Sequence, residues 1–285
     1  MTSRTWTIRE VLDWATQDFT ARGITSPRLD AELLVAKALG TDRVGLYLDL
    51  NRPLVDAERN AIRPLVGRRR EREPVAYILG HRDFYGRRFK VTPAVLIPRP
   101  DTETLVEHAL ACIPEDTACR VLDVGTGSGA IAITIAAARP LAMVTATDIS
   151  KAALEVAAEN AEHLEVARRI HFEQANLLND AAQYDVIVSN PPYIATAELA
   201  ALQPEIREHE PMAALEAGED GLDVIKALLS AAESATASGA QILIEVGAGQ
   251  APSVIDFATE RTAWQRVAVY PDLDRIDRVV HLRRT

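Results

Sequence analysis

The stretch Val121–Ile133, VLDVGTGSGAIAI, decides the fold class of this 285-residue chain. A predicted strand, Val121–Val124, leads into Gly125-Thr126-Gly127-Ser128-Gly129, and an apolar segment that favours a helix follows. Glycine permits a sharp backbone turn and lets a ligand approach the main chain closely. Asp123, near the end of the strand, carries a carboxylate that can meet a cationic amino group. The stretch therefore predicts a ligand-binding turn between a strand and a helix.

Strands and helices alternate on both sides of this turn, from about residue 100 to the end of the chain. Such alternation predicts an α/β fold of Rossmann-like type, with a mostly parallel seven-stranded sheet and helices on both faces. Ligands of these sheets bind beyond the C-terminal ends of the strands. The predicted strands are CRVLDVG (119–125), MVTATDI (143–149), RIHFEQA (169–175), YDVIVSN (184–190), GAQILIEVG (239–247), WQRVAVY (264–270) and RVVHLRR (278–284).

Two further regions precede the sheet. Residues 1–73 predict a small helical domain: apolar residues recur at helical spacing in 5–23, a second helix runs from Ser26-Pro27 to Gly40, and a third is interrupted near Pro64. Residues 74–98 alternate apolar and polar residues around two glycines, which predicts a β-hairpin linker. Residues 99–285 form the remaining domain.

The composition disfavours several classes of protein. Two cysteines, Cys112 and Cys119, build neither a disulfide framework nor a zinc site, and six scattered histidines suggest no metal centre. The N-terminus lacks the apolar stretch of a signal peptide, and AIAITIAAA (130–138) is too short to span a bilayer. We therefore expect a cytoplasmic protein with no membrane partner.

Charge is distributed unevenly along the chain. A net charge of −10 argues against a general nucleic-acid coat, so no stable nucleic-acid binding is expected. Residues 1–72, however, carry 13 Lys and Arg against 10 Asp and Glu, whereas the remainder carries 18 against 31. The basic stretch over 68–90 is either a solvated linker face or a docking surface for an acidic partner or RNA.

Asp148, at the end of the second predicted strand, extends the ligand-binding pattern. Its carboxylate can accept hydrogen bonds from both hydroxyls of a ribose, so the turn and this acid predict a cofactor of adenosine type. The pattern does not identify that cofactor, because Gly125, Gly127 and Ala130 also satisfy the dinucleotide fingerprint G-x-G-x-x-G/A. A nicotinamide oxidoreductase stays open at this point.

The seven residues VSNPPYI, Val188–Ile194, favour a different chemistry. A planar nitrogen is a poor nucleophile, but the Asn190 side-chain oxygen and a backbone carbonyl can accept its two N–H groups and orient it toward an electrophilic methyl. Pro191 and Pro192 fix φ and stiffen the carbonyl, and Tyr193 offers a flat face for stacking. Positioning would dominate catalysis, and a methyl sulfonium donor suits this arrangement whereas a nicotinamide ring does not.

With these motifs, the chain resembles the class I S-adenosylmethionine-dependent methyltransferases that act on planar nitrogens. LGHRDFYGRRFKVTPAVLIPRPDTE (79–103) resembles one branch closely, the release factor glutamine N5-methyltransferases of the PrmC/HemK family. The resemblance implies methylation of the glutamine in the GGQ loop of class I peptide chain release factors. It also implies that Gly125–Gly129 cradle the methionine part of the donor, that Asp148 binds its ribose, and that Asn190, Pro191, Pro192 and Tyr193 hold the glutamine amide, with Asn190 also near the methyl.

The chain departs from the family pattern at two places. Some relatives carry an Asp-Trp pair near the adenine where this chain has Asn176-Leu177; Asn176 can still hydrogen-bond the base, but Leu177 offers only apolar packing. Where the family usually has Phe-Glu-Pro, this chain has His209-Glu210-Pro211. We expect this segment to lie near the substrate entrance.

Three other functions compete with this interpretation. An adenine N6-methyltransferase could use the same Asn-Pro-Pro-Tyr motif, but it needs a surface that reads bases and phosphates. A dinucleotide oxidoreductase would bind NADH instead of S-adenosylmethionine. A non-catalytic ribosome-associated module would have no use for Asn190.

Overall fold

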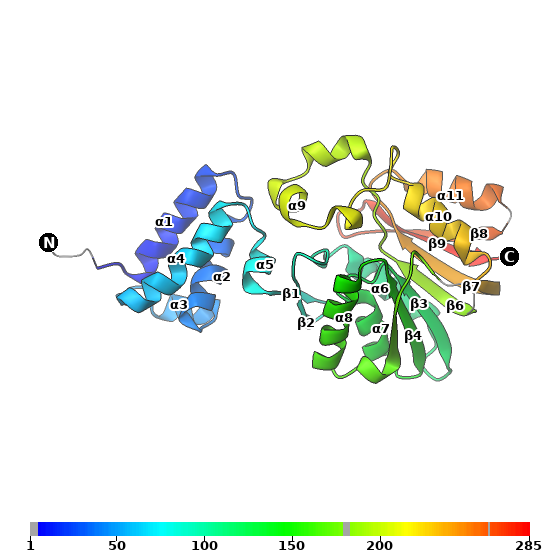
Figure 1. Cartoon of the computed structure of the whole chain (residues 1–285), viewed down its shortest axis with the longest axis horizontal. Coiled ribbons are helices and arrows are strands. Elements are labelled where there is room, and N and C mark those ends of the chain that lie inside the picture. Colours follow the sequence, from blue (N-terminus) through cyan, green and yellow to red (C-terminus); the bar gives the residue numbers. More distant parts are fainter. Residues whose placement is uncertain (1–4, 179–182, 262) are drawn as a thin grey trace. The chain divides into compact units, whose positions relative to one another are not determined.

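The computed structural model describes residues 5–178, 183–261 and 263–285, and the chain divides into two compact units. The helical unit comprises Met1–Gly80 together with Gln203–His209. The sheet unit comprises His81–Leu202 and Glu210–Thr285. Each unit has its own hydrophobic core, and Figure 1 labels the elements of both. In the described part of the chain, no helix has both the length and the apolar character needed to cross a membrane.

The sheet unit is built on seven strands, as the sequence predicts. Their spatial order is β5-β4-β3-β6-β7-β9-β8, and β9 alone runs antiparallel to both of its neighbours. The central strand β3 has parallel partners on both sides, β4 and β6. The strands are β3 (Cys119–Val124), β4 (Ala142–Asp148), β5 (Ile170–Gln174), β6 (Tyr184–Ser189), β7 (Thr236–Glu245), β8 (Trp264–Pro271) and β9 (Asp277–Arg284).

Helices cover both faces of this sheet because neighbouring strand residues point to opposite sides. Val121 faces one core with α6 (Thr102–Cys112) and α7 (Ala130–Ala138), while Leu122 faces the other with α10 (Asp223–Ala232) and α11 (Ala251–Glu260). The helix α8 (Lys151–His163) lies on the α7 side, as Figure 1 shows. Short 3₁₀ turns occupy Ala167–Arg169, Thr196–Ala201 and Met212–Ala214.

The predicted hairpin forms from β1 (His81–Phe84) and β2 (Arg87–Lys90). Tyr85 and Gly86 both have positive φ, +48° and +70°, as the tightest hairpin turns require. Extended structure was expected from residue 74 onward, but Val75–Leu79 is the short helix α5. Ala76, Tyr77 and Ile78 are buried in this helix. Tertiary packing therefore overrides the strand-like pattern of apolar and polar residues in this segment.

The helical unit is formed by α1 (Ile8–Ala21), α2 (Pro27–Leu39), α3 (Arg43–Leu48), α4 (Asp56–Arg70), α5 and α9 (Pro204–His209). As predicted, α2 follows Ser26 and ends at Gly40, which adopts the left-handed conformation. The predicted interruption at Pro64 is wrong, because α4 continues through it. Pro64 and Asn60, four residues earlier, are both exposed, so water can satisfy the carbonyl that loses its partner.

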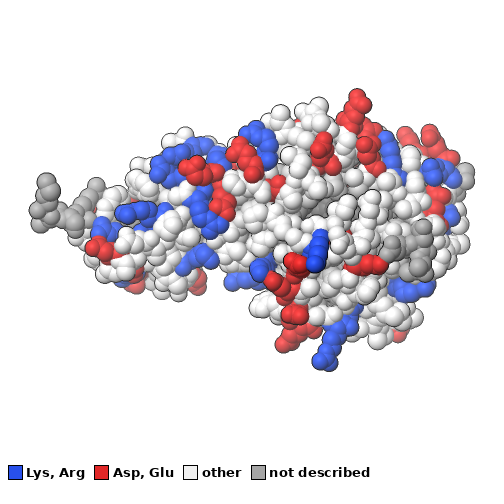
Figure 2. Space-filling view, in the orientation of Figure 1, with Lys and Arg blue, Asp and Glu red and all other residues white. Residues whose placement is uncertain are grey.

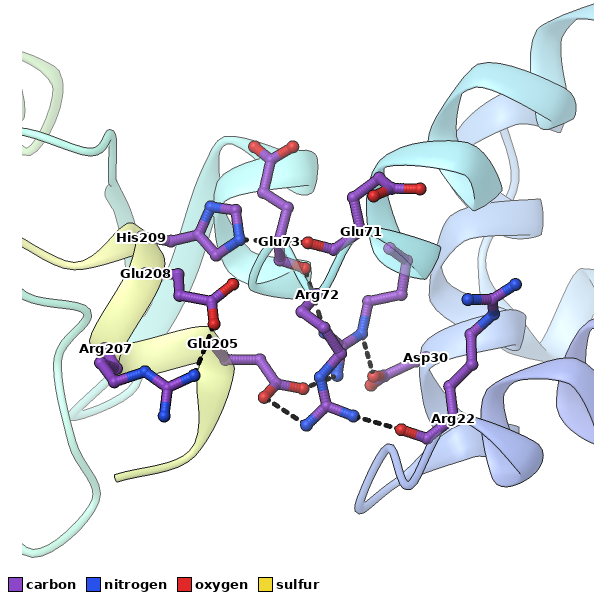
Figure 3. Close-up of polar contacts among 10 residues, drawn as sticks. Arg22, Asp30, Glu71, Arg72, Glu73, Glu205, Arg207, Glu208 and His209 are labelled. Carbon is purple, nitrogen blue, oxygen red and sulfur yellow. Dashed lines mark hydrogen bonds and ion pairs between the residues drawn. The ribbon is translucent and has the colours of Figure 1, made fainter. Parts of the chain in front are cut away.

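A buried ion-pair cluster fastens α9 to the long helices of the helical unit (Figure 3). The Arg69 guanidinium donates to Asp30 and to Glu205, both at 2.8 Å, and Arg72 donates to Glu205 at 2.6 Å. Burial raises the pKa of Asp30, and Arg69 opposes that shift. A segment far along the chain is therefore held by a cation at the end of α4.

Replacing Arg69 with Met should lower the free energy of unfolding of the helical unit by about 3–5 kcal/mol, because buried carboxylates lose their cation. Urea unfolding of the whole chain, followed by circular dichroism, measures this loss. Arg68→Met is the matched control: Arg68 pairs with Glu73 at the surface and should cost less than about 1 kcal/mol. Equal losses for the two variants would contradict the importance of the buried cluster.

Candidate active site

The glycine loop between β3 and α7 depends on backbone conformations that glycine adopts most readily. Gly125, Gly127 and Gly129 have φ of +72°, +55° and +81°. A Cβ on Gly129 would lie 2.7 Å from Ile133 Cδ1, so this glycine allows α7 to pack closely. A Cβ on Gly125 or Gly127 would enter open space. The loop thus presents main chain to an open region on its outer side.

Asp123 lies beneath this loop and is fully buried. Its Oδ2 accepts hydrogen bonds from Thr126 Oγ1 at 2.7 Å and from the Ala132 backbone N–H at 3.1 Å. Its Oδ1 has no partner within the described residues. Burial raises the pKa of Asp123 to about 7, although these two hydrogen bonds lower it. Asp123 therefore braces the loop and keeps one oxygen available.

Asp148, at the end of β4, braces the loop from the side. Its Oδ2 accepts the Gly127 N–H at 2.9 Å, and its Oδ1 accepts the Ser150 N–H at 2.9 Å. A carboxylate oxygen can accept two hydrogen bonds, so both oxygens can still accept a hydroxyl. The β4 backbone helps as well, because the Thr147 carbonyl accepts the N–H groups of Gly125 and Thr126.

Asn160 of α8 connects the loop to the hairpin. Its side-chain amide donates to the Ser128 carbonyl at 2.9 Å and to the Lys90 carbonyl at 3.0 Å, and it accepts the Lys90 N–H at 2.7 Å. The side chain is 1% exposed, so breaking this bridge would leave buried polar groups unpaired. The hairpin thus takes part in fixing the glycine loop.

Asn190 and Pro191 follow β6 directly, beside the glycine loop. Val124 pairs with Ser189 across the parallel strands β3 and β6, so the two loops leave the sheet side by side. Asn190 Nδ2 donates to Thr102 Oγ1 at 3.0 Å. Among the described residues, neither Asn190 Oδ1 nor the Pro191 carbonyl accepts a hydrogen bond. Two oxygen acceptors are therefore open next to the glycine loop.

The backbone of Tyr193 is fixed by residues that follow β7 and by Gly221. Gln250 Nε2 donates to the Tyr193 carbonyl at 2.9 Å, and a Cβ on Gly221 would lie 2.4 Å from the same oxygen. The Tyr193 hydroxyl makes a long 3.5 Å contact with Glu245 Oε1. Burial raises the pKa of Tyr193 to about 12, and the nearby Glu245 carboxylate adds to this shift. The phenol is therefore neutral near pH 7.

Glu245 is the last residue of β7 and lies beside Tyr193. It is 1% exposed, and burial raises its pKa to about 7, although the positive charge of Arg278 opposes this shift. Its Oε2 has no partner within the described residues. Thr102 therefore hydrogen-bonds to Asn190, and Glu245 borders Tyr193.

Glu210 holds the segment that leads into α6. Its carboxylate accepts the Ile97 N–H at 3.1 Å and the Arg99 guanidinium at 2.5 Å. The expectation that His209-Glu210-Pro211 lies near a substrate entrance stays a prediction. In the structure, the buried Glu210 carboxylate fixes residues 97–99, which precede Thr102.

Asn176 and Leu177 follow β5. Asn176 is exposed, whereas Leu177 packs partly against the core. Leu177 has a φ of +73°, which is uncommon for a leucine and costs about 1–2 kcal/mol. Thr147 Oγ1 donates to the Leu177 carbonyl at 2.6 Å and holds this conformation. The adenine role expected for this pair stays a prediction.

Comparisons with known proteins identify the family. Residues 10–80 match the PrmC N-terminal domain and residues 101–210 match the methyltransferase small domain. A release factor glutamine methyltransferase of Geobacter sulfurreducens is 47% identical over 277 residues, covering 96% of each chain. One of Rhodopirellula baltica is 39% identical over 286 residues, covering 98% of this chain and 97% of that one.

The chain belongs to the release factor glutamine methyltransferase family. A solved methyltransferase of Pyrococcus furiosus shares the fold, with a TM-score of 0.52, 15% identity, and coverage of 70% of this chain and 90% of that one. Membership in the release factor glutamine methyltransferase family confirms the resemblance inferred from Val121–Ile133 and Val188–Ile194. It decides against the oxidoreductase, the adenine methyltransferase and the non-catalytic module.

The structure gathers most of the predicted residues of this methyltransferase at one edge of its sheet. The glycine loop, Asp148 and the Asn190–Tyr193 turn all follow the C-terminal ends of parallel strands. Sequence reasoning missed Thr102, Glu245 and Gln250. A signal was present for Glu245 alone, because it ends an apolar strand in the same way as Asp148 does.

Asp123→Asn should remove one pH dependence of the free energy of unfolding. Because its pKa is raised, folded Asp123 holds a proton between about pH 4 and 7 that the unfolded chain releases, so the free energy of unfolding falls as pH rises through this window. Relative to wild type, the Asn variant should therefore gain about 1–3 kcal/mol between pH 5 and pH 8. Urea unfolding across this range measures the gain.

Asp185→Asn serves as the control for this titration. Burial by itself would raise the pKa of Asp185, but the backbone hydrogen bond, the side-chain hydrogen bond and the positive charge of Arg120 together lower it. Its titration lies below pH 5, so the difference from wild type should stay flat. A flat difference for Asp123→Asn as well would show that Asp123 is ionised throughout.

Proposed function

We propose that the chain transfers a methyl group from S-adenosyl-L-methionine to the side-chain nitrogen N5 of the glutamine in the GGQ motif of class I peptide chain release factors. The product is N5-methylglutamine. One observation carries the site assignment: two open acceptors, Asn190 Oδ1 and the Pro191 carbonyl, stand beside a glycine loop with room for a ligand.

The residues around the glycine loop fit this donor. Gly125 and Gly127 leave open space where side chains would stand, and Asp123 Oδ1 is a buried oxygen without a partner in the described chain. Asp148 can accept the ribose hydroxyls, Gly125–Gly129 can hold the methionine part, and Asn176 and Leu177 can border the adenine. When bound, the donor supplies an electrophilic methyl carbon on a sulfonium.

The Asn190–Tyr193 turn supplies the orientation that a weak nucleophile needs. Two oxygen acceptors can take the two N–H groups of the glutamine amide and fix its nitrogen. Positioning of this kind can lower the barrier by roughly 7–11 kcal/mol. Both acceptors also stabilise the positive charge that develops on nitrogen during methylation. A strong base is unnecessary, because the nitrogen becomes acidic once it is methylated and its proton can leave to water.

Asn190→Ala should lower kcat by about 10²-fold or more, because one acceptor at the reacting nitrogen is lost. Mass spectrometry of a release factor, incubated with enzyme and isotope-labelled donor, measures the rate and identifies the modified atom. Calorimetric donor affinity should change far less. The function is wrong if wild-type enzyme labels an atom other than glutamine N5, and the role of Asn190 is wrong if turnover of the variant matches wild type.

The helical unit offers a place where the protein substrate can dock. A pocket of about 420 Å³ lies between α1 and α4, with Trp6, Trp14, Val11, Ile62 and Val66 among its lining residues. Trp14 is 43% exposed. Aromatic side chains in such pockets are typical of protein interfaces.

The charged rim of this pocket favours an acidic partner. Arg59, Arg63 and Arg70 line it together with Gly67, and none of the described residues that line it is acidic. Arg63 has no acidic partner within the described chain, whereas Arg70 pairs with Asp18. Figure 2 shows Lys and Arg interspersed with Asp and Glu on the visible face of this unit. We infer that the pocket receives an apolar side chain of the release factor flanked by carboxylates.

The basic stretch over 68–90 is a weaker candidate, because its cations are largely engaged. Arg68, Arg69 and Arg72 pair with acids within the helical unit, and Arg88 and Lys90 pair with acids within the sheet unit. The hypothesis that residues 1–73 dock the substrate is therefore supported by the pocket more than by this basic stretch.

Trp14→Ala combined with Arg63→Glu should raise the KM for the intact release factor by at least 10-fold, because the apolar contact and the rim charge are lost. The kcat/KM for a short GGQ peptide should stay within about twofold of wild type. Leu48→Ala, on α3 and 81% exposed outside the pocket, is the control. An unchanged KM for the intact protein would remove the pocket from the docking surface.

A further inference from the structure

The side-chain amide of Gln250 joins three loops at the C-terminal edge of the sheet. Its Nε2 donates to the Tyr193 carbonyl at 2.9 Å and, over a longer 3.4 Å, to the Gly221 carbonyl. Its Oε1 accepts the Gly247 N–H at 2.8 Å. These three partners follow β6, precede α10 and follow β7, respectively. Gln250, the residue before α11, therefore connects the Asn190–Tyr193 turn to two neighbouring loops.

Two glycines leave the space that the Gln250 amide occupies. A Cβ on Gly221 would lie 2.8 Å from Gln250 Nε2 and 2.4 Å from the Tyr193 carbonyl oxygen. A Cβ on Gly247 would lie 2.9 Å from Gln250 Oε1 and 3.2 Å from Cδ2 of the Tyr193 ring. Gly221 also has a φ of +73°, which favours glycine. The amide is therefore held against bare main chain, where packing as well as hydrogen bonding restricts it.

The three partners of Gln250 match the chemistry of an amide. A side-chain amide offers two N–H donors and a carbonyl acceptor, and it meets two carbonyls and one N–H here. A carboxylate in the same place could accept the Gly247 N–H, but its second oxygen would face the Tyr193 carbonyl oxygen. An apolar side chain would leave all three main-chain groups without this partner.

The middle of the Asn190–Tyr193 turn depends on how its two ends are held. Among the described residues, no hydrogen bond reaches the main chain of Pro191 or Pro192. The prolines restrict φ, and Pro192 also restricts the residue before it. At one end, the Ser189 hydroxyl donates to a carbonyl of β3 at 2.8 Å, and at the other end Gln250 holds the Tyr193 carbonyl. The direction of the Pro191 carbonyl therefore depends on both of these contacts.

We propose that Gln250 is a positioning residue that holds the Tyr193 carbonyl and thereby fixes the direction of the Pro191 carbonyl toward the glutamine amide. The inference rests on the proposed function and deepens it. Gln250 does not have to touch the substrate, because main-chain groups occupy both ends of its amide. Gly247, one of these partners, also borders the Tyr193 ring, so the same contact restricts the stacking face.

Gln250→Leu and Gln250→Glu test this role. At pH 8 both variants lack the donor to the Tyr193 carbonyl, so kcat on a short GGQ peptide should fall by about 10-fold or more. Donor affinity by calorimetry should stay within about threefold of wild type. At pH 5 part of the introduced carboxyl is protonated, because the ordinary glutamate pKa is about 4.3 and the facing carbonyl oxygens raise it. Relative to wild type at the same pH, Gln250→Glu should then recover at least threefold, whereas Gln250→Leu should not.

Gln183→Leu and Gln183→Glu are the matched controls. Gln183 also donates to a main-chain carbonyl, that of Ser234 at 3.3 Å, but it precedes the first residue of β6 at the opposite end of that strand. Both controls should keep kcat within about twofold of wild type at either pH. Wild-type activity of Gln250→Leu, or equal losses in the two Gln250 variants at both pH values, would overturn the proposal. If urea unfolding shows that Gln250→Leu does not fold, the recovery of Gln250→Glu decides alone.

Nuclear magnetic resonance of protein labelled with ¹³C at the tyrosine carbonyls gives a readout that needs no substrate. Tyr193→Phe identifies the Tyr193 signal. This signal should shift in Gln250→Leu and in Gln250→Glu at pH 8, and it should return toward its wild-type position in Gln250→Glu at pH 5. A signal that moves in neither variant overturns the proposal. If wild-type enzyme leaves the release factor glutamine unmodified, the proposed function fails, whereas this signal still decides whether Gln250 holds the turn.

Discussion

Parallel pairing of β3 with β6 is the constraint on which the site depends. Because parallel strands end at the same edge of a sheet, the loop after Val124 and the turn after Ser189 emerge next to each other. The Ser189 hydroxyl reinforces this edge by donating to the Val124 carbonyl at 2.8 Å. The glycine loop and the Asn190–Tyr193 turn, whose first residues are 65 positions apart in the sequence, thereby lie at one place.

Buried polar groups stabilise the geometry of that site, because each forms hydrogen bonds with the backbone or with another side chain. Asp123 holds the glycine loop from below, Asn160 joins it to the hairpin, and Glu210 fixes the segment before α6. Such groups are costly to bury unless they are hydrogen-bonded. Within the described part of the chain, the two buried carboxyl groups that have an oxygen without a partner, on Asp123 and Glu245, are also those whose pKa burial raises to about 7.

The helical unit is not one continuous piece of the chain. It includes Gln203–His209, which the sequence places in the methyltransferase half, and the buried Arg69 holds this segment through Glu205. After the Asn190–Tyr193 turn, the chain therefore passes into the helical unit and returns to the sheet unit at Glu210. The helical unit is therefore linked to the sheet unit by the chain at three places: after Gly80, before Gln203 and after His209.

The seven strands, the Rossmann-like class and the family could all be predicted from the amino-acid sequence, because each depends on local patterns. Apolar runs of strand length, glycines at a strand end and Asn-Pro-Pro-Tyr can all be recognised within about ten residues. The same local reasoning misassigned Val75–Leu79 and Pro64, where burial of Ala76–Ile78 and exposure of the proline decided the outcome. Only the tertiary structure brought Thr102, Glu245 and Gln250 to the turn and Glu205 to Arg69. These contacts join residues from about 50 to more than 130 positions apart, and no local pattern records which distant hydrogen-bond partner a buried polar group will find.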